Sequence, residues 1–306
     1  MGGEQTIVRP TLVTIGICTY RRTAVVETLR SLAAQELPVG VVMQVVVADN
    51  DANPEAADRV KQAGAELALN VTYVHAPSRN ICLARNACLD AAAGQWIAFL
   101  DDDETASPTW LAALLAETQR SGCDAVLGPV HAVYSDLSPA WIRAADLHST
   151  RPVVSAGGIK KGYAGNVIIR CATIAGLGLR FDLALGRSGG EDDDFFYRLT
   201  DGGGSIGFAP DAVAYEPVPS ERTTLRWLLR RSFRTGQTHG ARLGMRHQGL
   251  RRLPQALLAA GKGLVCLTAA GGGAVSELRR NRWLVRGALH MGVVARLAGL
   301  DDLQLY

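Results

Sequence analysis

The sequence predicts a mixed α/β domain with a mainly parallel sheet, followed by a C-terminal helical extension. Apolar runs of the strand type alternate with stretches that have the period of an amphipathic helix, which is the pattern of βαβ units. The 306 residues are 48% hydrophobic and 20% charged, which excludes a disordered chain and a coiled coil. Residues 1–219 contain 17 basic and 25 acidic side chains, whereas residues 220–306 contain 15 basic and 4 acidic ones. We therefore expect a domain over 1–219 and a basic amphipathic helical region over 220–306.

The first part begins with strands that alternate with helices. The predicted strands cover residues 11–19, 41–49, 70–76, 95–103 and 124–130, and the predicted helices cover 24–35, 54–65, 80–94 and 107–122. Asn80 and Gly94 are typical of the start and the end of the third helix, and Ser107-Pro108 is typical of the start of the fourth. Buried strands that alternate with helices indicate a mainly parallel sheet with helices on both faces.

The pattern is weaker in the second half of this part. Residues 131–165 are predicted to form loop and short helix, and residues 166–171 a strand. A helix is predicted within residues 187–199, where four acidic side chains precede an apolar run. Residues 205–217 are predicted to form a β-hairpin around Pro210-Asp211.

Polar side chains follow each of the first four strands. Since ligands bind outside the carboxyl ends of the strands in such sheets, this coincidence predicts a binding site at one edge. The polar residues are Thr19, Tyr20, Arg21 and Arg22, then Asp49, Asn50 and Asp51, then Arg79 and Asn80, and finally Asp101, Asp102, Asp103 and Glu104.

The carboxylate triplet at 101–103 follows the apolar run WIAFL. Neighbouring carboxylates at the end of a buried strand repel one another, so they either take up protons or surround a cation. Oxygen ligands of this kind suit Mg²⁺ or Mn²⁺. The alternative is a solvated acidic loop that caps the helix near Ser107.

Two arginines are candidates for anion binding. The spacing of Arg85 from Ile81 and Cys88 brings its guanidinium to or beside the inward face of the third helix, where it needs an anion or a carboxylate. The alternative is an arginine that reaches the surface or pairs with an acid of the domain. Arg79 lies just before the same helix, where it could help to hold an anion.

Asp192 is a candidate general base. It shares a helix face with Phe195, Phe196 and Leu199, so we expect it to face the interior near a cleft. A partly buried carboxylate with a raised pKa can accept a proton from a substrate. Asp194 forms an i,i+4 pair with Arg198 and is interpreted as structural.

Four motifs in this order, TIGICTYRR, VVVADN, ARNACLDAAAGQWIAFLDDDE and GGEDDDFFYRL, resemble the family-2 inverting glycosyltransferases of the GT-A fold. The exopolysaccharide (succinoglycan-type) branch is the most similar, and the resemblance spans residues 11–240. It implies a Rossmann-like sheet and a metal-dependent transfer of a hexose, with inversion, from a nucleotide-sugar. A UDP-sugar donor and a hydroxyl of a glycan or lipid-linked acceptor are expected, as in exopolysaccharide or cell-surface polysaccharide synthesis.

The resemblance also implies roles for single residues. Thr19 and Tyr20 would contact the base or lie beside it, Asp49 would bind the base edge, Arg85 would serve the nucleotide, and Asp101 and Asp102 would face base and ribose. We expect Arg21 and Arg79 to belong to the same nucleotide site. Asp103 would bind the Mn²⁺ or Mg²⁺ ion that bridges the diphosphate, Asp192 would be the catalytic base, and Glu191 would orient the acceptor. Gly165 and Asn166 resemble the segment near the acceptor and donor sugar, and Arg231 and Arg234 match a region where basic residues approach the diphosphate.

The chain departs from the family pattern at one position. Many relatives have a histidine after the strand that follows the acidic helix, often as a further metal ligand. Here that place holds Tyr215-Glu216-Pro217, and His239 comes later. Whether Glu216 or His239 is the third protein ligand of the metal stays open.

The basic region contains two long apolar stretches. Residues 256–275 are interrupted by Lys262 and a glycine triplet, and therefore fall short of the ~18 apolar residues that a full membrane span needs. Residues 282–300 are amphipathic, with three arginines. Such helices are typical of membrane-surface elements that favour anionic lipid. The alternatives are a helical hairpin packed on the first part, or a homodimer contact.

Partner and compartment follow from composition. Nucleic-acid binding is not expected, because the first part is acidic and only 4 of the 32 basic residues are lysines. Six cysteines without a CxxC pair favour a reducing compartment. We expect a cytoplasmic protein that is peripheral at the inner face of the cell membrane.

Two rival functions remain at this point. Residues 101–105 fit the DxDx[TV] signature of haloacid-dehalogenase-like phosphatases, with Asp101 as the nucleophile. In those enzymes the signature follows the first strand, whereas three strands precede it here. The second rival is a non-catalytic nucleotide-sugar-binding module, against which the presence of Asp192 argues.

Overall fold

The computed structural model describes residues 10–187, 189–246, 249–273 and 275–303. It divides into two compact units, of which the first contains the chain up to Ala132 and the segment Ser149–Glu216. The second contains Val133–His148 and the chain from Pro217 onwards. The predicted division at residue 219 stays a prediction, and the sequence carried no signal for the membership of Val133–His148 in the second unit.

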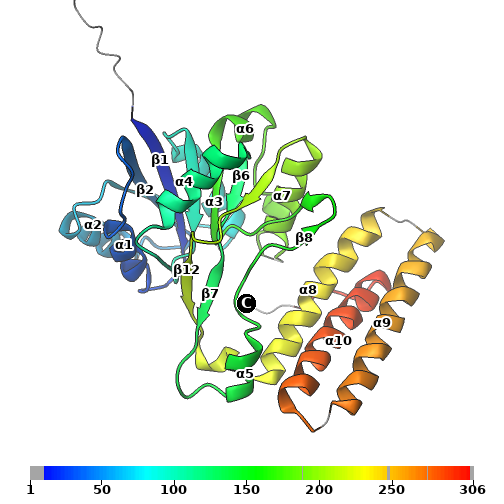
Figure 1. Cartoon of the computed structure of the whole chain (residues 1–306). Helices are drawn as coiled ribbons and strands as arrows, with labels where there is room; N and C mark the ends of the chain where they lie inside the picture. Colours follow the sequence, from blue (N-terminus) through cyan, green and yellow to red (C-terminus); the bar gives the residue numbers. More distant parts are fainter. Residues whose placement is uncertain (1–9, 188, 247–248, 274, 304–306) are drawn as a thin grey trace, which may run out of the picture. The chain divides into compact units, whose positions relative to one another are not determined.

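The first unit is built on a seven-stranded sheet with the order β11-β6-β10-β4-β1-β2-β3 (Figure 1). Strand β1 pairs in parallel with β2 and β4, β2 with β3, and β6 with β11, whereas β10 runs antiparallel to both of its neighbours. The predicted fold class, a mixed α/β domain with a mostly parallel sheet and C-terminal helices, is confirmed. The strands are β1 Thr11–Thr19, β2 Val41–Asp49, β3 Val71–His75, β4 Trp96–Leu100, β6 Ala125–Leu127, β10 Asn166–Arg170 and β11 Ile206–Phe208.

Helices cover both faces of this sheet (Figure 1). Side chains alternate along a strand, so Val45 and Val47 of β2 join the core on one face, and Val46 and Ala48 join the core on the other. The first core contains side chains of α1 Val25–Ala33, α2 Ala57–Glu66 and α4 Trp110–Ser121. The second contains side chains of α3 Ile81–Ala91, α6 Cys171–Gly176 and α7 Glu191–Asp201.

The predicted hairpin over residues 205–217 is wrong. β11 belongs to the large sheet, whereas β12 Ala214–Pro217 lies between β5 Thr105–Ala106 and β7 Val130–Val133 in a separate three-stranded sheet. The Ala209 amide donates to the Leu127 carbonyl and the Ala214 amide to the Pro129 carbonyl. The chain therefore continues along the segment after β6 and does not fold back on itself at Pro210.

Strand 124–130 was predicted as one element and is two. β6 ends at Leu127 and β7 begins at Val130, with Gly128-Pro129 between them. Proline has no amide hydrogen to continue a ladder, which explains the break. The segment predicted as loop and short helix contains α5 Ala140–Ala145 and a two-stranded sheet of β8 Val154–Ser155 and β9 Gly158–Ile159. The described residues also include the short 3-10 helices η1 Leu183–Leu185, η2 Ser220–Arg222 and η3 Gly249–Arg251.

The described residues of the second unit include the long helices α8 Leu225–Arg246, α9 Arg252–Gly272 and α10 Glu277–Leu297 (Figure 1). α10 packs against both of the others. A Cβ atom at Gly236 of α8 would lie 1.9 Å from the Leu289 carbonyl oxygen, and one at Gly292 of α10 would lie 2.0 Å from the Phe233 carbonyl oxygen. The backbones of α8 and α10 thus touch directly, which only glycine at these two positions permits.

Candidate active site

The polar residues after the strands meet at one edge of the large sheet. Thr19 and Asp49 are register partners at the ends of β1 and β2. The Thr19 hydroxyl donates to Asp102 Oδ2 at 2.7 Å, which joins the end of β1 to the loop after β4. This juxtaposition follows from parallel pairing, because parallel strands bring their carboxyl ends to the same edge.

The loop after β4 holds a buried group of carboxylates. Asp102 and Glu104 are 5% and 3% exposed, and Asp101 is half-buried at the edge of the same group. Burial raises the pKa of Asp101 to about 7, with Asp103 and Asp192 adding to the shift and Arg85 opposing it. Burial also raises the pKa of Glu104 well above its usual value, and the carboxylates of Asp101 and Glu216 add to this. Burial therefore favours the protonated forms of Asp101 and Glu104, and a bound cation would favour their ionised forms.

Arg22 is the cation that the structure brings to this group. Its guanidinium donates to Asp102 Oδ1 at 3.0 Å and also contacts Asp103. Arg21, the neighbour that was predicted for the site, pairs instead with Asp51 at 2.8 Å. Arg22 is among the polar residues predicted at the strand ends, but only Arg21 was expected to contact the nucleotide, because the sequence contains no signal that separates two adjacent arginines.

Asp192 lies at the start of α7 and is held by two other elements. Arg85 of α3, whose side chain is only 7% exposed, contacts Asp192 Oδ1 and donates to Glu191 Oε1 at 2.8 Å. The amide of Ala164 donates to Asp192 Oδ2 at 3.1 Å. Burial raises the pKa of Asp192 to about 6, while Arg85 opposes this and Glu191 adds to it. As predicted, Phe195, Phe196 and Leu199 of the same face are fully buried.

The acidic group and Asp192 meet at the segment Ala164–Gly165. Ala164 bonds Asp192, and the next residue lies against the acidic group. A Cβ atom at Gly165 would lie 2.9 Å from Glu104 Oε1 and 3.0 Å from Asp101 Oδ2, so any side chain there would displace these carboxylates. Asp192 and the carboxylates of Asp101 and Glu104 therefore lie at the same short segment, although more than 80 residues separate them in sequence.

Two predicted ligand-binding residues have side chains that already form hydrogen bonds within the protein. Asn166 is fully buried, with its amide nitrogen bonded to the Pro129 and Ala212 carbonyls and its oxygen bonded to the Trp110 indole. Asp49 is 1% exposed and accepts hydrogen bonds from Tyr73 and from two amides of the loop after β2. Both roles toward a ligand stay predictions, and in this structure the two side chains fix loops.

The remaining predicted nucleotide contacts lie on exposed turns. Tyr20 is 37% exposed, and the Arg21 guanidinium lies 5.3 Å from the centre of its ring. Arg21 and Arg79 have left-handed backbones, with φ of 56° and 48°, which is unusual for residues other than glycine. Such strain often accompanies functional sites, so it supports a role for these two turns. Arg231 and Arg234 belong to α8 of the second unit, and their predicted approach to the diphosphate is not tested.

The donor atoms suit a hard divalent ion. All are carboxylate oxygens, the ligands that Mg²⁺ and Mn²⁺ prefer, and burial leaves several of them with raised pKa values. As the side chains stand, no three His, Cys, Asp or Glu residues converge on one metal-sized point within the described parts of the chain. Glu216 is close enough to Glu104 to raise its pKa, whereas His239 belongs to the second unit.

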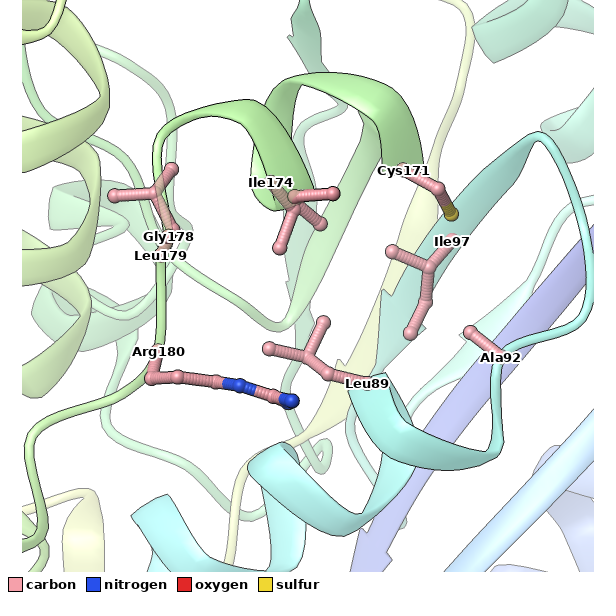
Figure 2. Close-up of a pocket in the computed structure, with 9 residues that line it drawn as sticks. Leu89, Ala92, Ile97, Cys171, Ile174, Gly178, Leu179 and Arg180 are labelled. Atoms are coloured by element: carbon pink, nitrogen blue, oxygen red, sulfur yellow. The ribbon is translucent and has the colours of Figure 1, made fainter.

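A separate hollow of about 370 Å³ lies at the other end of β4 (Figure 2). Ile97, near the amino end of that strand, lines it together with Leu89, Cys171 and Ile174. Figure 2 shows Arg180 at its rim, and this side chain pairs with Asp90 at the surface. The hollow is apolar and contains none of the carboxylates described above.

Comparisons with known proteins identify the family. Residues 14–178 match the model of glycosyl transferase family 2. The chain is 48% identical to the succinoglycan biosynthesis protein ExoM of Rhizobium meliloti (strain 1021) over 292 residues, which are 95% of this chain and 94% of that protein.

Solved structures show the same fold. The mannosyltransferase PcManGT from Pyrobaculum calidifontis, in complex with GDP-Man and Mn²⁺, superposes with a TM-score of 0.63 at 19% identity, over 95% of this chain and 88% of that one. S. aureus TarS 1–349, in complex with UDP-GlcNAc, superposes with a TM-score of 0.55 at 16% identity, over 95% and 92% of the two chains. The predicted GT-A fold and the predicted resemblance are both confirmed. The chain belongs to glycosyl transferase family 2.

Proposed function

We propose that this glycosyltransferase is metal-dependent and inverting, and that it moves a hexose from a UDP-sugar to a hydroxyl group of a glycan or lipid-linked acceptor. Family membership supports the class of reaction over the phosphatase alternative. The proposal of a metal-dependent, inverting mechanism rests on one observation, which is that Asp192 and the buried carboxylates meet at Ala164–Gly165.

Asp192 is the proposed catalytic base. With a pKa of about 6 it is ionised at neutral pH and still basic enough to take the proton of an alcohol that is being deprotonated by attack. As the acceptor oxygen bonds the anomeric carbon, the bond from that carbon to the diphosphate breaks on the opposite face. The proton passes to Asp192, and the anomeric configuration inverts.

Arg85 and the Ala164 amide orient the proposed base. Each bonds one of its two oxygens, which fixes the plane of the carboxylate. Glu191 shares the Arg85 guanidinium and is proposed to contact the acceptor. Because Arg85 is bonded to these two acids, we propose that it does not contact the nucleotide directly and acts on the reaction through Asp192 and Glu191.

Asp103 is the proposed main ligand of a Mn²⁺ or Mg²⁺ ion, with Glu216 as the preferred candidate for a further ligand. Such an ion supplies positive charge that stabilises the diphosphate as a leaving group. Arg22, which contacts Asp103 in this structure, is proposed to turn toward the phosphates when the donor binds. PcManGT has been solved with Mn²⁺, which supports this proposal.

The nucleotide is proposed to lie along the strand ends that carry Thr19, Tyr20, Arg21, Asp49, Arg79, Asp101 and Asp102. Tyr20, Arg21 and Arg79 would touch it directly, while Thr19 and Asp49 would hold the loops. Gly165 is proposed to leave room for the sugar beside Asp101. Arg231 and Arg234 stay proposed contacts of the diphosphate.

The biological setting follows from the relative. Since ExoM is a succinoglycan biosynthesis protein, we propose a role in exopolysaccharide or cell-surface polysaccharide synthesis. The enzyme would work in the cytoplasm at the inner face of the cell membrane. Nucleic acid is not a proposed partner.

A thermal-shift panel tests the donor class. UDP, GDP, dTDP and CDP are each added with and without Mn²⁺, and Asp103→Asn is measured beside the wild type. We expect UDP to stabilise the wild type only with Mn²⁺, and the variant to lose this dependence. Stabilisation by UDP without metal, or an unchanged response of Asp103→Asn, would contradict the assignment.

A further inference from the structure

Helix α9 buries its small residues and exposes its large ones. Its buried side of Ala259, Gly263, Cys266 and Ala270 faces the bundle. Leu257 and Leu264 are 72% and 64% exposed, and Leu253, Leu258, Val265 and Leu267 are also more than half exposed. A helix of a water-soluble bundle has the reverse arrangement, with its large apolar residues inside.

A lipid environment around α9 explains this arrangement, whereas an aqueous environment does not. In an apolar solvent no hydrophobic drive favours burying leucine, so helices pack through small residues and turn large apolar side chains outward. α9 follows this rule: a Cβ atom at Gly287 of α10 would lie 3.3 Å from the Cys266 Cβ atom, a close approach of the two helices. Within the described residues, one helix, Gly249–Gly272, is long and apolar enough to cross a membrane, and only 22% of its apolar 18-residue window is buried.

A groove of about 640 Å³ runs between the exposed leucines of α9 and α10. Leu257, Leu258 and Val265 form its apolar wall, and Trp283 lies on the α10 side. Lys262 and Arg286, both exposed, line the same groove and bring two positive charges to it. The chain has no acidic residue between Glu221 and Glu277, so the long apolar helix lies in a segment of purely basic charge.

We propose that α9 lies in the interface of an anionic phospholipid bilayer, with its leucine face among the acyl chains and with one lipid phosphate held in the groove by Lys262 and Arg286. This deepens the membrane association of the proposed function and rests on it. Charge complementarity identifies the occupant, since a second copy of this surface would bring like charges together.

The positions of Lys262 and Arg286 indicate that α9 lies on the membrane and does not cross it. Lys262 lies at the middle of α9, so a spanning helix would carry it to the bilayer centre. A lysine or arginine at the bilayer centre is strongly disfavoured. A helix in the interface plane keeps both cations at the level of the phosphates and still buries the leucines.

Vesicle flotation of the full chain tests the proposal. Neutral phosphatidylcholine vesicles are compared with vesicles that also contain phosphatidylglycerol, and inorganic phosphate is added in excess as a competitor. We expect the wild type to float with the anionic vesicles. Lys262→Ala with Arg286→Ala should weaken binding roughly twenty-five-fold, since each cation contributes about fivefold. Arg59→Ala with Lys61→Ala on α2 removes the same charge elsewhere and should change little.

The leucine face is tested separately. Leu257→Glu with Leu264→Glu should weaken vesicle binding roughly tenfold or more, whereas Leu137→Glu with Leu183→Glu, at other exposed positions, should not. Binding of inorganic phosphate by a protein that does not float with anionic vesicles would show a phosphate site without a membrane role and would overturn the proposal. Absence of flotation, equal binding to neutral vesicles, or self-association through α9 would also overturn it.

Activity separates this proposal from the proposed reaction. Hydrolysis of a UDP-sugar in solution does not need the membrane, so it should survive in all of these variants. A wild type that hydrolyses the donor but does not float would leave the reaction standing and refute the membrane surface. A wild type that floats but has no activity toward any nucleotide-sugar would refute the proposed reaction and leave the membrane surface standing.

Discussion

At the scale of single residues, the central feature is a buried arginine shared by two acids. Arg85 of α3 holds Glu191 and Asp192 of α7, and its guanidinium also lies 5.3 Å from the centre of the Phe181 ring. The inward direction of Arg85 and of Asp192 could be predicted from helical spacing. Their pairing could not, because it depends on how α3 and α7 pack on the same face of the sheet.

Arg85→Ala should destabilise the protein by about 3 kcal/mol, because it leaves two partly buried carboxylates without their cation. Urea unfolding at neutral pH measures this. The loss should shrink at lower pH, where protonation removes the unpaired charges. Arg180→Ala is the matched control, since Arg180 pairs with Asp90 through exposed side chains and should cost less than about 1 kcal/mol.

The pH dependence of transfer should report the proposed base. Asp192 must be ionised to accept a proton, and its pKa is raised to about 6. The rate should therefore be constant above about pH 7 and fall about tenfold per pH unit well below 6. Initial rates at constant ionic strength measure this. A profile that stays flat down to pH 4.5 would mean that another group takes the proton.

At the scale of elements, prediction succeeded where the pattern was long and failed where it was short. β1 and β2 have the predicted bounds, because nine-residue apolar runs leave little choice. The hairpin failed because β11 and β12 are three and four residues long, and such strands take their partners from the surrounding sheets. Alternation alone cannot distinguish a hairpin from two strands in different sheets.

The contact of α8 with α10 can be tested with glycine substitutions. Gly292→Ala should destabilise the second unit by roughly 1–3 kcal/mol, because the new Cβ atom would lie 2.0 Å from the Phe233 carbonyl oxygen. Gly261→Ala, in a helix position with nothing within 4 Å, should stabilise α9 by up to about 1 kcal/mol. Thermal unfolding compares the two. Equal effects would mean that the helices are not in backbone contact.

At the scale of the whole molecule, charge separates two kinds of surface. The buried carboxylates of the acidic residues 1–219 lie at the proposed donor site, whereas the basic residues 220–306 include the helix with exposed leucines. The sequence predicts this division of charge, whereas the membrane-surface character of the second part stays a proposal. The sequence did not predict that α9 turns its leucines outward, since periodicity shows which residues share a face and not which face is covered.

An acidic site for a polyanion requires a cation, so ligand binding should be cooperative between metal and nucleotide. UDP at about 100 times its Kd, with Mn²⁺, should stabilise the chain by about 2.7 kcal/mol, or roughly 5 °C in Tm. Mn²⁺ alone should give a smaller shift. Equal shifts for UDP with EDTA and UDP with Mn²⁺ would show that the carboxylates do not act through a metal.

The most direct test of the central claim is sugar transfer by Asp192→Asn, measured together with UDP–Mn²⁺ binding. Loss of the base should lower the transfer rate about 10²–10⁴-fold while binding stays close to that of the wild type. Asp194→Asn, on the same turn but paired with Arg198, is the control and should remain active. Transfer by Asp192→Asn at a rate within roughly tenfold of the wild type would contradict the account, because removal of a true general base costs more than this.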